Sequence, residues 1–251
     1  MATNAVLIGQ QIPRESRWSK LTFENKFFLI YSVAFPLITF IGYAPTFYLK
    51  PLFQTPPIAG GLVIAHGVLM TAWIVLFGVQ AYLVSAKKVR THITLGMLGI
   101  SIATAMVFVG VVTAIESLKR GAAFPGWTAN QWFIIPIADM VVFPILFAAA
   151  IYLRHDSASH KRLMLLIMVN WLGPSIARFP LAFILDLGTL WFFGVPALIA
   201  AGFLAYDTYR NGKMNKAFAI GFAISLISWP LRLAISYTDA WEKFATLVSW
   251  S

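Results

Sequence analysis

Seven long runs of mostly apolar residues limit what this chain can fold into. They cover residues 27–49, 61–84, 93–117, 132–153, 163–185, 189–209 and 217–237. Each run matches the roughly 20 residues that a helix needs to cross a bilayer. Backbone groups inside lipid must be paired within the protein, which leaves only helices and closed β-barrels. Barrel strands are about 10 residues long and alternate polar with apolar side chains, unlike these runs. We therefore predict an all-α polytopic membrane protein, a bundle of seven transmembrane helices in contact with the lipid bilayer.

The basic residues outside the runs predict the orientation. One set lies before the first run and in the second, fourth and sixth connections: Arg14, Arg17, Lys20, Lys26, Lys87, Lys88, Arg90, Arg154, Lys161, Arg162, Arg210, Lys213 and Lys216. The other side has only Lys50, Lys119, Arg120 and Lys243. Because basic loops stay cytoplasmic, we expect the N-terminus inside and the C-terminus outside, in a bacterial inner membrane.

The short connections predict one membrane domain and no second domain. We divide the chain into a cytoplasmic basic segment, residues 1–26, and a single seven-helix transmembrane domain, residues 27–251. The segment 1–26 lacks the apolar core of a signal peptide. Its part 15–26 fits either a short amphipathic helix on the membrane surface or a mobile basic tail.

Composition excludes several classes of function. The chain has no Cys, so disulfides, thiolate metal sites and a cysteine nucleophile are excluded. The net charge of +10 does not indicate nucleic-acid binding, because the charges lie in short clusters between apolar runs. The sequence contains no Gly-x-Ser-x-Gly and no His-Glu-x-x-His motif. The run 217–237 has no lysine, so a retinal Schiff base is not expected.

Ionisable residues inside the runs are costly and indicate function, and four of them stand out because they are expected at one level. His66, Asp139, Arg178 and Arg232 are all expected at a similar depth in the outer half of the bundle. Asp139 could pair with one arginine and leave the other for an anionic ligand, a haem propionate or a lipid headgroup. The alternative is an ion pair that only fixes the register of the helices.

Polar and aromatic residues at helical spacing predict that this outer level is a cavity. In the last run Gly221, Ser225, Ser228 and Arg232 recur every three or four residues and share one face. Trp73 shares a face with His66, and Trp171 shares one with Arg178. We expect a ligand-binding set at this level: Asp139, Arg178, Arg232, Trp73, Trp171 and Ser228.

Two further histidines are expected together at the inner end. His92 and His160 precede two helices that both start from the cytoplasmic side, so their depths should match. Neutral imidazole is the commonest metal ligand, and the pair could hold a metal ion or haem iron. The alternative is that both lie at the interface and meet lipid phosphate.

The region from the second to the third run resembles a known family. It reads His66-Gly-Val-Leu-Met, then Lys87-Lys88, then His92 at the start of the next helix. This resembles the ascorbate-reducible transmembrane cytochromes b of the b-561 class. The resemblance implies electron transfer across the membrane by two b haems, each with two axial histidines. It makes His66, His92 and His160 candidate cofactor ligands, and the fourth run offers only Met140 as a further one.

Three functions fit these observations. The first is a b-type haem redox protein, indicated by His66, His92 and the motif between them. The second is a haem-free protein that binds or transports a small anionic or amphipathic ligand, indicated by Arg178 and Arg232. The third is an accessory subunit that has a partner in a membrane complex, indicated by the scarcity of chemical groups. Short loops exclude a large soluble catalytic domain.

Overall fold

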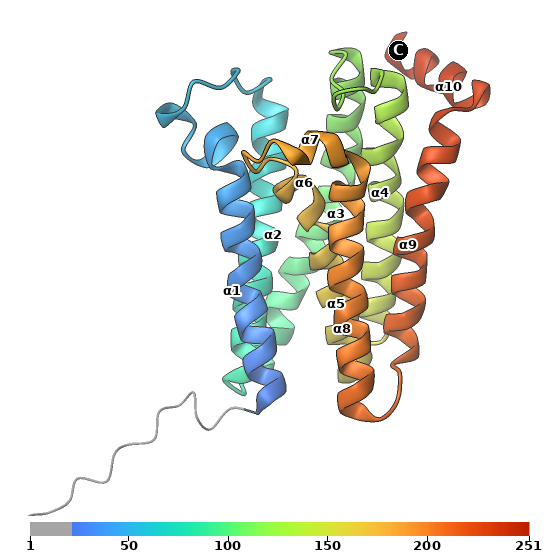
Figure 1. Cartoon of the computed structure of the whole chain (residues 1–251). Helices are drawn as coiled ribbons and strands as arrows, with labels where there is room; N and C mark the ends of the chain where they lie inside the picture. The colour runs from blue at the N-terminus through green and yellow to red at the C-terminus, as the bar shows by residue number, and fades with distance from the viewer. Residues whose placement is uncertain (1–21, 251) are drawn as a thin grey trace, which may run out of the picture.

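The computed structural model describes residues 22–250, and all regular secondary structure in that range is helical (Figure 1). The long helices are α1 (Phe23–Tyr43), α2 (Gly61–Ser85), α3 (Val89–Lys119), α4 (Ala129–Tyr152), α8 (Val195–Asn211) and α9 (Lys216–Ser236). The shorter helices are α5 (Ser157–Asn170), α6 (Leu172–Ile176), α7 (Phe183–Leu187) and α10 (Asp239–Trp250). The chain also forms two π-helical turns, η1 (Ala44–Tyr48) and η3 (Leu190–Gly194), and a 3₁₀ turn, η2 (Lys50–Leu52). The all-α prediction is confirmed.

Within residues 22–250, six helical segments are long and apolar enough to cross a membrane. They are Phe23–Tyr48, Gly61–Ser85, Val89–Lys119, Ala129–Tyr152, Leu190–Asn211 and Lys216–Ser236. Large apolar side chains lie on the outer surface of the bundle, and Phe108 and Leu198 are 69% and 74% exposed. A bilayer would cover such surfaces, so these helices support a multi-pass membrane protein.

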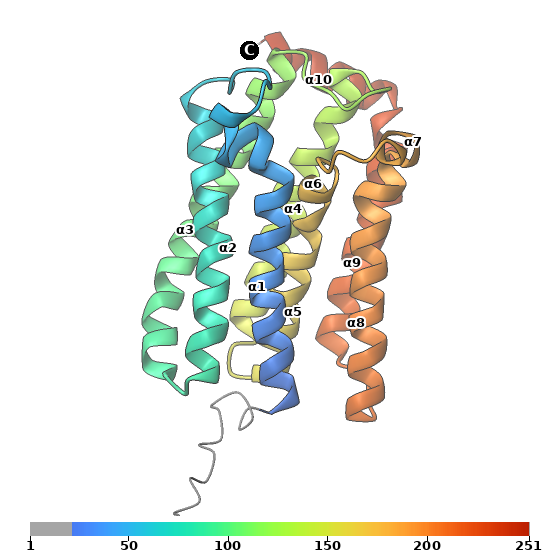
Figure 2. The ribbon, with the colours of Figure 1, turned by 60° about the vertical axis from the view of Figure 1, so that its left-hand side comes forward.

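The run predicted as the fifth span, 163–185, is divided rather than continuous. Helix α5 ends at Asn170, and α6 begins two residues later. Pro174 accounts for the break, because a proline has no N–H to donate and its ring clashes with the carbonyl four residues earlier, here that of Asn170. The chain nevertheless passes from one end of the bundle to the other through α5 and α6 (Figures 1 and 2).

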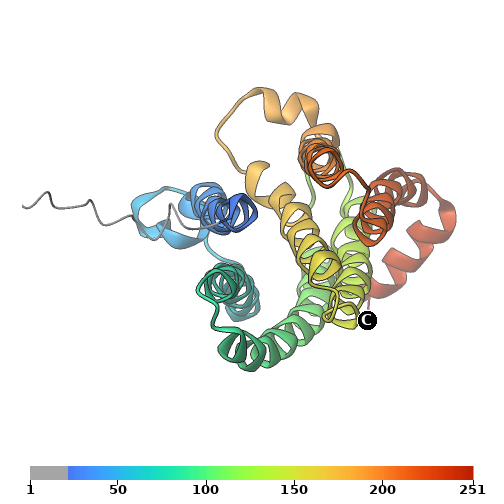
Figure 3. The same cartoon turned by 90° about the horizontal axis from the view of Figure 1, so that it is seen from below.

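Helix α5 lies in the middle of the bundle, surrounded by the longer helices (Figure 3). Its residues Leu165, Leu166, Ile167, Met168 and Val169 are consecutive and all are 2% exposed or less. Five consecutive residues cover every side of a helix, so this part of α5 has no polar face. The core of the protein is therefore built around this short helix, with α1, α4, α8 and α9 packed against it.

The ends of the bundle differ in charge. The start of α1 and the loops 86–88, 153–156 and 212–215 lie at one end, which we call the basic end (Figures 1 and 2). The C-terminus lies at the opposite end.

Helix α1 begins at Phe23, four residues before the predicted start, and the Thr22 hydroxyl caps it by accepting from the Asn25 N–H at 3.2 Å. Most of segment 1–26, including 15–21 of the proposed surface helix, lies outside the described residues.

Helix α10 was not predicted from the sequence. It folds back onto α3 and α4 at the end opposite the basic end (Figure 1). The Trp241 indole N–H donates to the Asn130 carbonyl at 2.8 Å, and Ala245 is fully buried. The Asn130 amide also donates to Glu242 at 2.5 Å. These contacts fix the C-terminal residues to the bundle.

Candidate functional site

A buried ion pair joins α4 to α9. Arg232 is 4% exposed, and its Nη1 donates to Asp139 Oδ1 at 2.6 Å and to the Ile135 carbonyl at 3.2 Å. The guanidinium carbon also lies 5.3 Å from the centre of the Phe193 ring. Asp139 thus pairs with one of the two candidate arginines and neutralises it. Arg232 is not the surplus cation that an anionic ligand would need.

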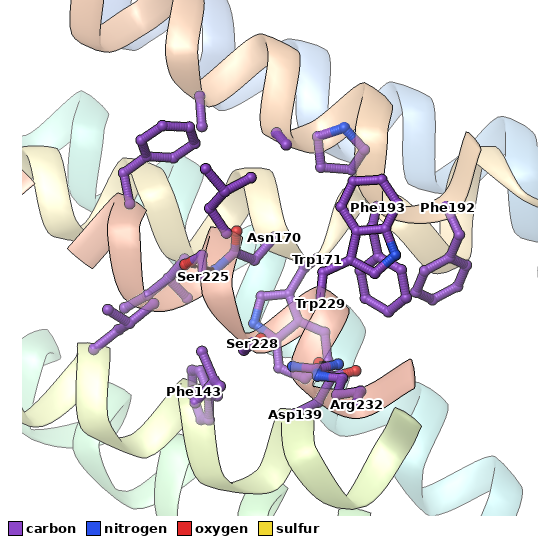
Figure 4. Close-up of a pocket in the computed structure, with 18 residues that line it drawn as sticks. Asp139, Phe143, Asn170, Trp171, Phe192, Phe193, Ser225, Ser228, Trp229 and Arg232 are labelled. Carbon is purple, nitrogen blue, oxygen red and sulfur yellow. Dashed lines mark hydrogen bonds and ion pairs between the residues drawn. The ribbon is translucent and has the colours of Figure 1, made fainter. Parts of the chain in front are cut away.

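The pair borders a small cavity of about 60 Å³ (Figure 4). Four predicted ligand-binding residues line it: Asp139, Arg232, Trp171 and Ser228. Its wall also carries buried polar atoms without protein partners, Arg232 Nε and Trp229 Nε1. One buried water needs about 10–15 Å³, so the cavity has room for a few waters or one small ion. Pockets for larger ligands are typically 300–1,000 Å³, so a haem or an amphipathic molecule does not fit.

The expected four-residue cluster does not form, because Arg178 lies outside this cavity. The break at Pro174 places Arg178 beyond the end of α6, where it is exposed. Its Nη1 donates to the Pro174 carbonyl at 2.6 Å, and its guanidinium lies 4.3 Å from the centre of the Tyr43 ring. His66 lies within electrostatic reach of Arg178 rather than beside Asp139.

Trp73 also lies outside the cavity, which corrects its predicted role. Its side chain is 3% exposed and packs edge-on against Phe143 and Phe147, with ring centres 5.6 and 5.3 Å away. This position is part of the apolar core. The face that carries Trp73 therefore packs against α4, and the Trp73 Nε1 is buried without a hydrogen-bond partner.

The structure brings His92 and His160 together at the basic end, as predicted from helix direction. Their ring centres are 6.4 Å apart and the ring planes are inclined by 83°. His160 Nδ1 lies 2.8 Å from the Ala150 carbonyl oxygen, so in neutral histidine Nδ1 is the donor and Nε2 keeps its lone pair. His92 Nδ1 is buried and has no hydrogen-bond partner.

Gln80 of α2 completes this site. Its Nε2 donates to the His92 carbonyl at 3.1 Å, which ties α2 to the first turn of α3. Its Oε1 is buried and has no partner. The site therefore contains two imidazole rings and two buried polar atoms without a protein partner, Gln80 Oε1 and His92 Nδ1, and such atoms are uncommon in folded proteins.

The distance between the two ring centres can be compared with the distance expected for two imidazoles bound to one metal ion. A metal–imidazole bond is about 2.0–2.1 Å, and a ring nitrogen lies about 1.2 Å from the ring centre, so imidazoles on opposite sides of one metal have centres about 6.4 Å apart. At a tetrahedral angle the same bonds would give about 5.2 Å. The observed 6.4 Å is close to the first of these distances and longer than the second.

The second haem site implied by the resemblance is not formed in the same way. It would need a partner for His66 from α4, and Met140 was the only candidate. Met140 is 8% exposed, and its sulfur occupies the space that a Cβ on Gly110 of α3 would take. Its side chain is therefore used in packing α4 against α3.

One ion pair was missed by the sequence analysis. Arg162, counted there as a loop residue, is 6% exposed and binds Asp207 through Nε–Oδ2 at 2.7 Å and Nη2–Oδ1 at 2.5 Å. Asp207 lies within the sixth apolar run, and an acidic residue inside a predicted span was the signal that could have found the pair.

Comparisons with known proteins add no family or fold assignment. No protein-family model matches the chain, and no curated protein or solved structure matches it. The function is therefore argued from the geometry of the chain's own residues.

Proposed function

We propose that the protein is a b-type haem electron-transfer protein of the membrane, with His92 and His160 as the axial ligands. The observation that carries the proposal is the 6.4 Å separation of the two ring centres, which suits imidazoles on opposite faces of one metal. Haem iron held by two side-chain ligands supplies one-electron chemistry when bound.

The donor set favours haem over a free metal ion. In the part of the chain that the structure describes, no group of three or more His, Asp or Glu residues is placed to hold a metal. A metal bound by His92 and His160 alone would need its other ligands from elsewhere. A porphyrin brings four equatorial nitrogens and requires only the two axial positions from the protein.

The chain's own residues orient these ligands. The Ala150 carbonyl accepts from His160 Nδ1–H, which fixes the ring and leaves Nε2 as the coordinating atom. The hydrogen bond from Gln80 to the His92 carbonyl holds the start of α3 at the level of His160. The two rings come from α3 and α5, whose first turns lie at the same end of the bundle (Figure 2).

The test is the visible spectrum of the purified protein, before and after incubation with haemin. We expect a Soret band and a sharp reduced α band, lost in both His92→Ala and His160→Ala. His155→Ala is the matched control, because His155 is exposed in the same loop region and should leave the spectrum unchanged. A protein that takes up no haem, or two single variants with normal spectra, would show that the proposal is wrong.

We also propose seven passes through a bacterial inner membrane, with the basic end in the cytoplasm. The route of α5 and α6 across the bundle supports an odd number of passes, and the basic residues of the loops at the basic end support the orientation. A periplasmic reporter fused after Trp250 should be active, and the same reporter fused within 212–215 should be inactive. The reverse pattern would contradict the proposed seven-pass topology, and two fusions of equal activity would show that α9 does not cross the membrane.

A further inference from the structure

A second, larger cavity lies at the basic end between α1, α5 and α8. Its volume is about 310 Å³, within the range of sites for small organic ligands. Six aromatic rings line it: Phe23, Phe27, Phe28, Phe203, Tyr206 and Phe218. The lining residues come from the first turns of α1, the first half of α5, the last turns of α8 and the start of α9, so the cavity lies at the basic ends of candidate membrane-spanning helices.

Aromatic rings of α1 and α8 contact one another in the wall of the cavity. Phe203 of α8 lies edge-on to Phe27 and Tyr31 of α1, with ring centres 5.3 and 4.5 Å away. Tyr206 lies nearly parallel to Phe27 at 6.3 Å. Aromatic walls of this kind favour a planar ligand, because ring faces and edges stack best on another flat ring.

The buried charges in the wall are already paired. Arg162 is bound by both oxygens of Asp207 and donates its Nη1 to the Ala158 carbonyl at 2.7 Å. Asn211 donates to the same Asp207 carboxylate at 3.0 Å. Glu24 forms an ion pair with Lys161 at 2.5 Å. The buried part of the cavity is therefore electrically balanced, which favours a neutral ligand over an anion.

Hydrogen-bond donors remain at the mouth. Arg210, on the last turn of α8, rests its guanidinium 5.0 Å from the centre of the Phe23 ring. The Tyr206 hydroxyl lies one turn earlier on the same helix and also lines the cavity. A guanidinium offers five N–H donors and no acceptor, so the complementary ligand atom is an oxygen such as a carbonyl.

We propose that this cavity binds the head group of a lipid-soluble quinone. Such a head group is planar and neutral, carries two carbonyl acceptors and resides in the membrane. Its ring would pack among the phenylalanines, and one carbonyl would accept from Arg210. The inference rests on the cavity alone and does not require a haem.

The test measures binding of decyl-ubiquinone to the protein in nanodiscs of phosphatidylcholine, by equilibrium dialysis and absorbance. We expect saturable binding that weakens by about tenfold or more in Arg210→Gln, the loss expected for a charge-assisted hydrogen bond. Phe203→Ala should also weaken it. Arg154→Gln is the matched control, because Arg154 is exposed at the same end and does not line the cavity.

The outcomes separate this inference from the haem proposal and from a lipid site. Binding by His92→Ala protein equal to that of the wild type would support a quinone site independent of haem. Absence of saturable binding, or equal affinity in Arg210→Gln and wild type, would overturn the inference. Displacement of the quinone by phosphatidylglycerol, with retention of that lipid on purification, would identify an anionic lipid headgroup as the occupant and also overturn it.

Discussion

Removal of the Asp139 carboxylate should destabilise the protein strongly, because it leaves a buried guanidinium without its counter-ion. Arg232 is 4% exposed, and apart from Asp139 its guanidinium donates to the Ile135 carbonyl at 3.2 Å. Removing one partner of a buried pair costs about 3–5 kcal/mol in proteins generally. We expect a loss of that size in the free energy of unfolding for Asp139→Ala, measured by equilibrium unfolding in detergent.

A second change at Arg232 should recover most of this loss. In Asp139→Ala/Arg232→Met no charge is left buried, and replacing a whole buried pair with apolar residues is often neutral. The double variant should therefore be more stable than Asp139→Ala, with a coupling energy of about 2–3 kcal/mol, at the upper end for residues in contact.

Arg178 provides the control for this cycle. It is exposed and contacts Tyr43, so Asp139→Ala and Arg178→Leu should be additive within about 0.3–0.5 kcal/mol. Additive losses for Asp139 and Arg232, or rescue of Asp139→Ala by Arg178→Leu instead, would refute the assignment of Arg232 as the partner.

Two further predictions concern packing and pH. Gly42→Ala would place a Cβ against the Ser175 backbone carbonyl and should lower the free energy of unfolding by about 1–3 kcal/mol, measured by thermal or chemical unfolding. Gly202→Ala, whose Cβ meets open space, is the control and should leave the free energy of unfolding unchanged. Equal stability of the two variants would contradict the close contact of α1 with α6. The hydrogen bond from the Ser159 hydroxyl, followed by those from backbone N–H groups, lowers the pKa of Asp156 below its usual value. A lowered pKa means that Asp156 contributes stability above about pH 4 and loses it as the pH falls through the folded-state value. The advantage of wild type over Asp156→Asn in melting temperature should therefore shrink on acidification from pH 6, and an advantage that grows instead would contradict this cap.

The extent of the fold that the sequence predicts depends on how each helix is buried. Six of the seven predicted runs correspond to long helices, because lipid-facing helices must be apolar over about 20 residues. The fifth run failed as a single helix because hydropathy does not register backbone breaks. Pro174 ends α5 at Asn170, and the polar start Ser157–Arg162 belongs to the same helix although the sequence assigned it to a loop.

The same limit applies to the candidate sites. His92 and His160 could be paired from sequence, because the direction of two helices fixes the depth of their first residues. The grouping of Arg178 with Asp139 also depended on an unbroken helix, and after the break at Pro174 Arg178 lies outside the cavity that Asp139 lines. Helix α10 was missed because its amphipathic pattern is short, and its anchor to Asn130 joins residues more than 100 positions apart.

The polar contacts between helices explain which residues remain for chemistry. Apolar packing alone aligns membrane helices weakly, since lipid tails are as apolar as the side chains, so hydrogen bonds between helices stabilise the register. Four examples connect segments distant in sequence: Asp139 with Arg232, Arg162 with Asp207, Asn170 with Ser225 at 2.9 Å, and Ser175 with Thr39 at 3.3 Å. Three of the four begin on α5 or α6 and reach α8, α9 and α1, so the central helix is fixed on three sides. Residues used in this way satisfy one another and have little capacity left for a ligand. His92, His160 and Arg210 take no part in these four contacts and lie at the basic end, and for that reason both proposed sites lie there rather than at the buried ion pair.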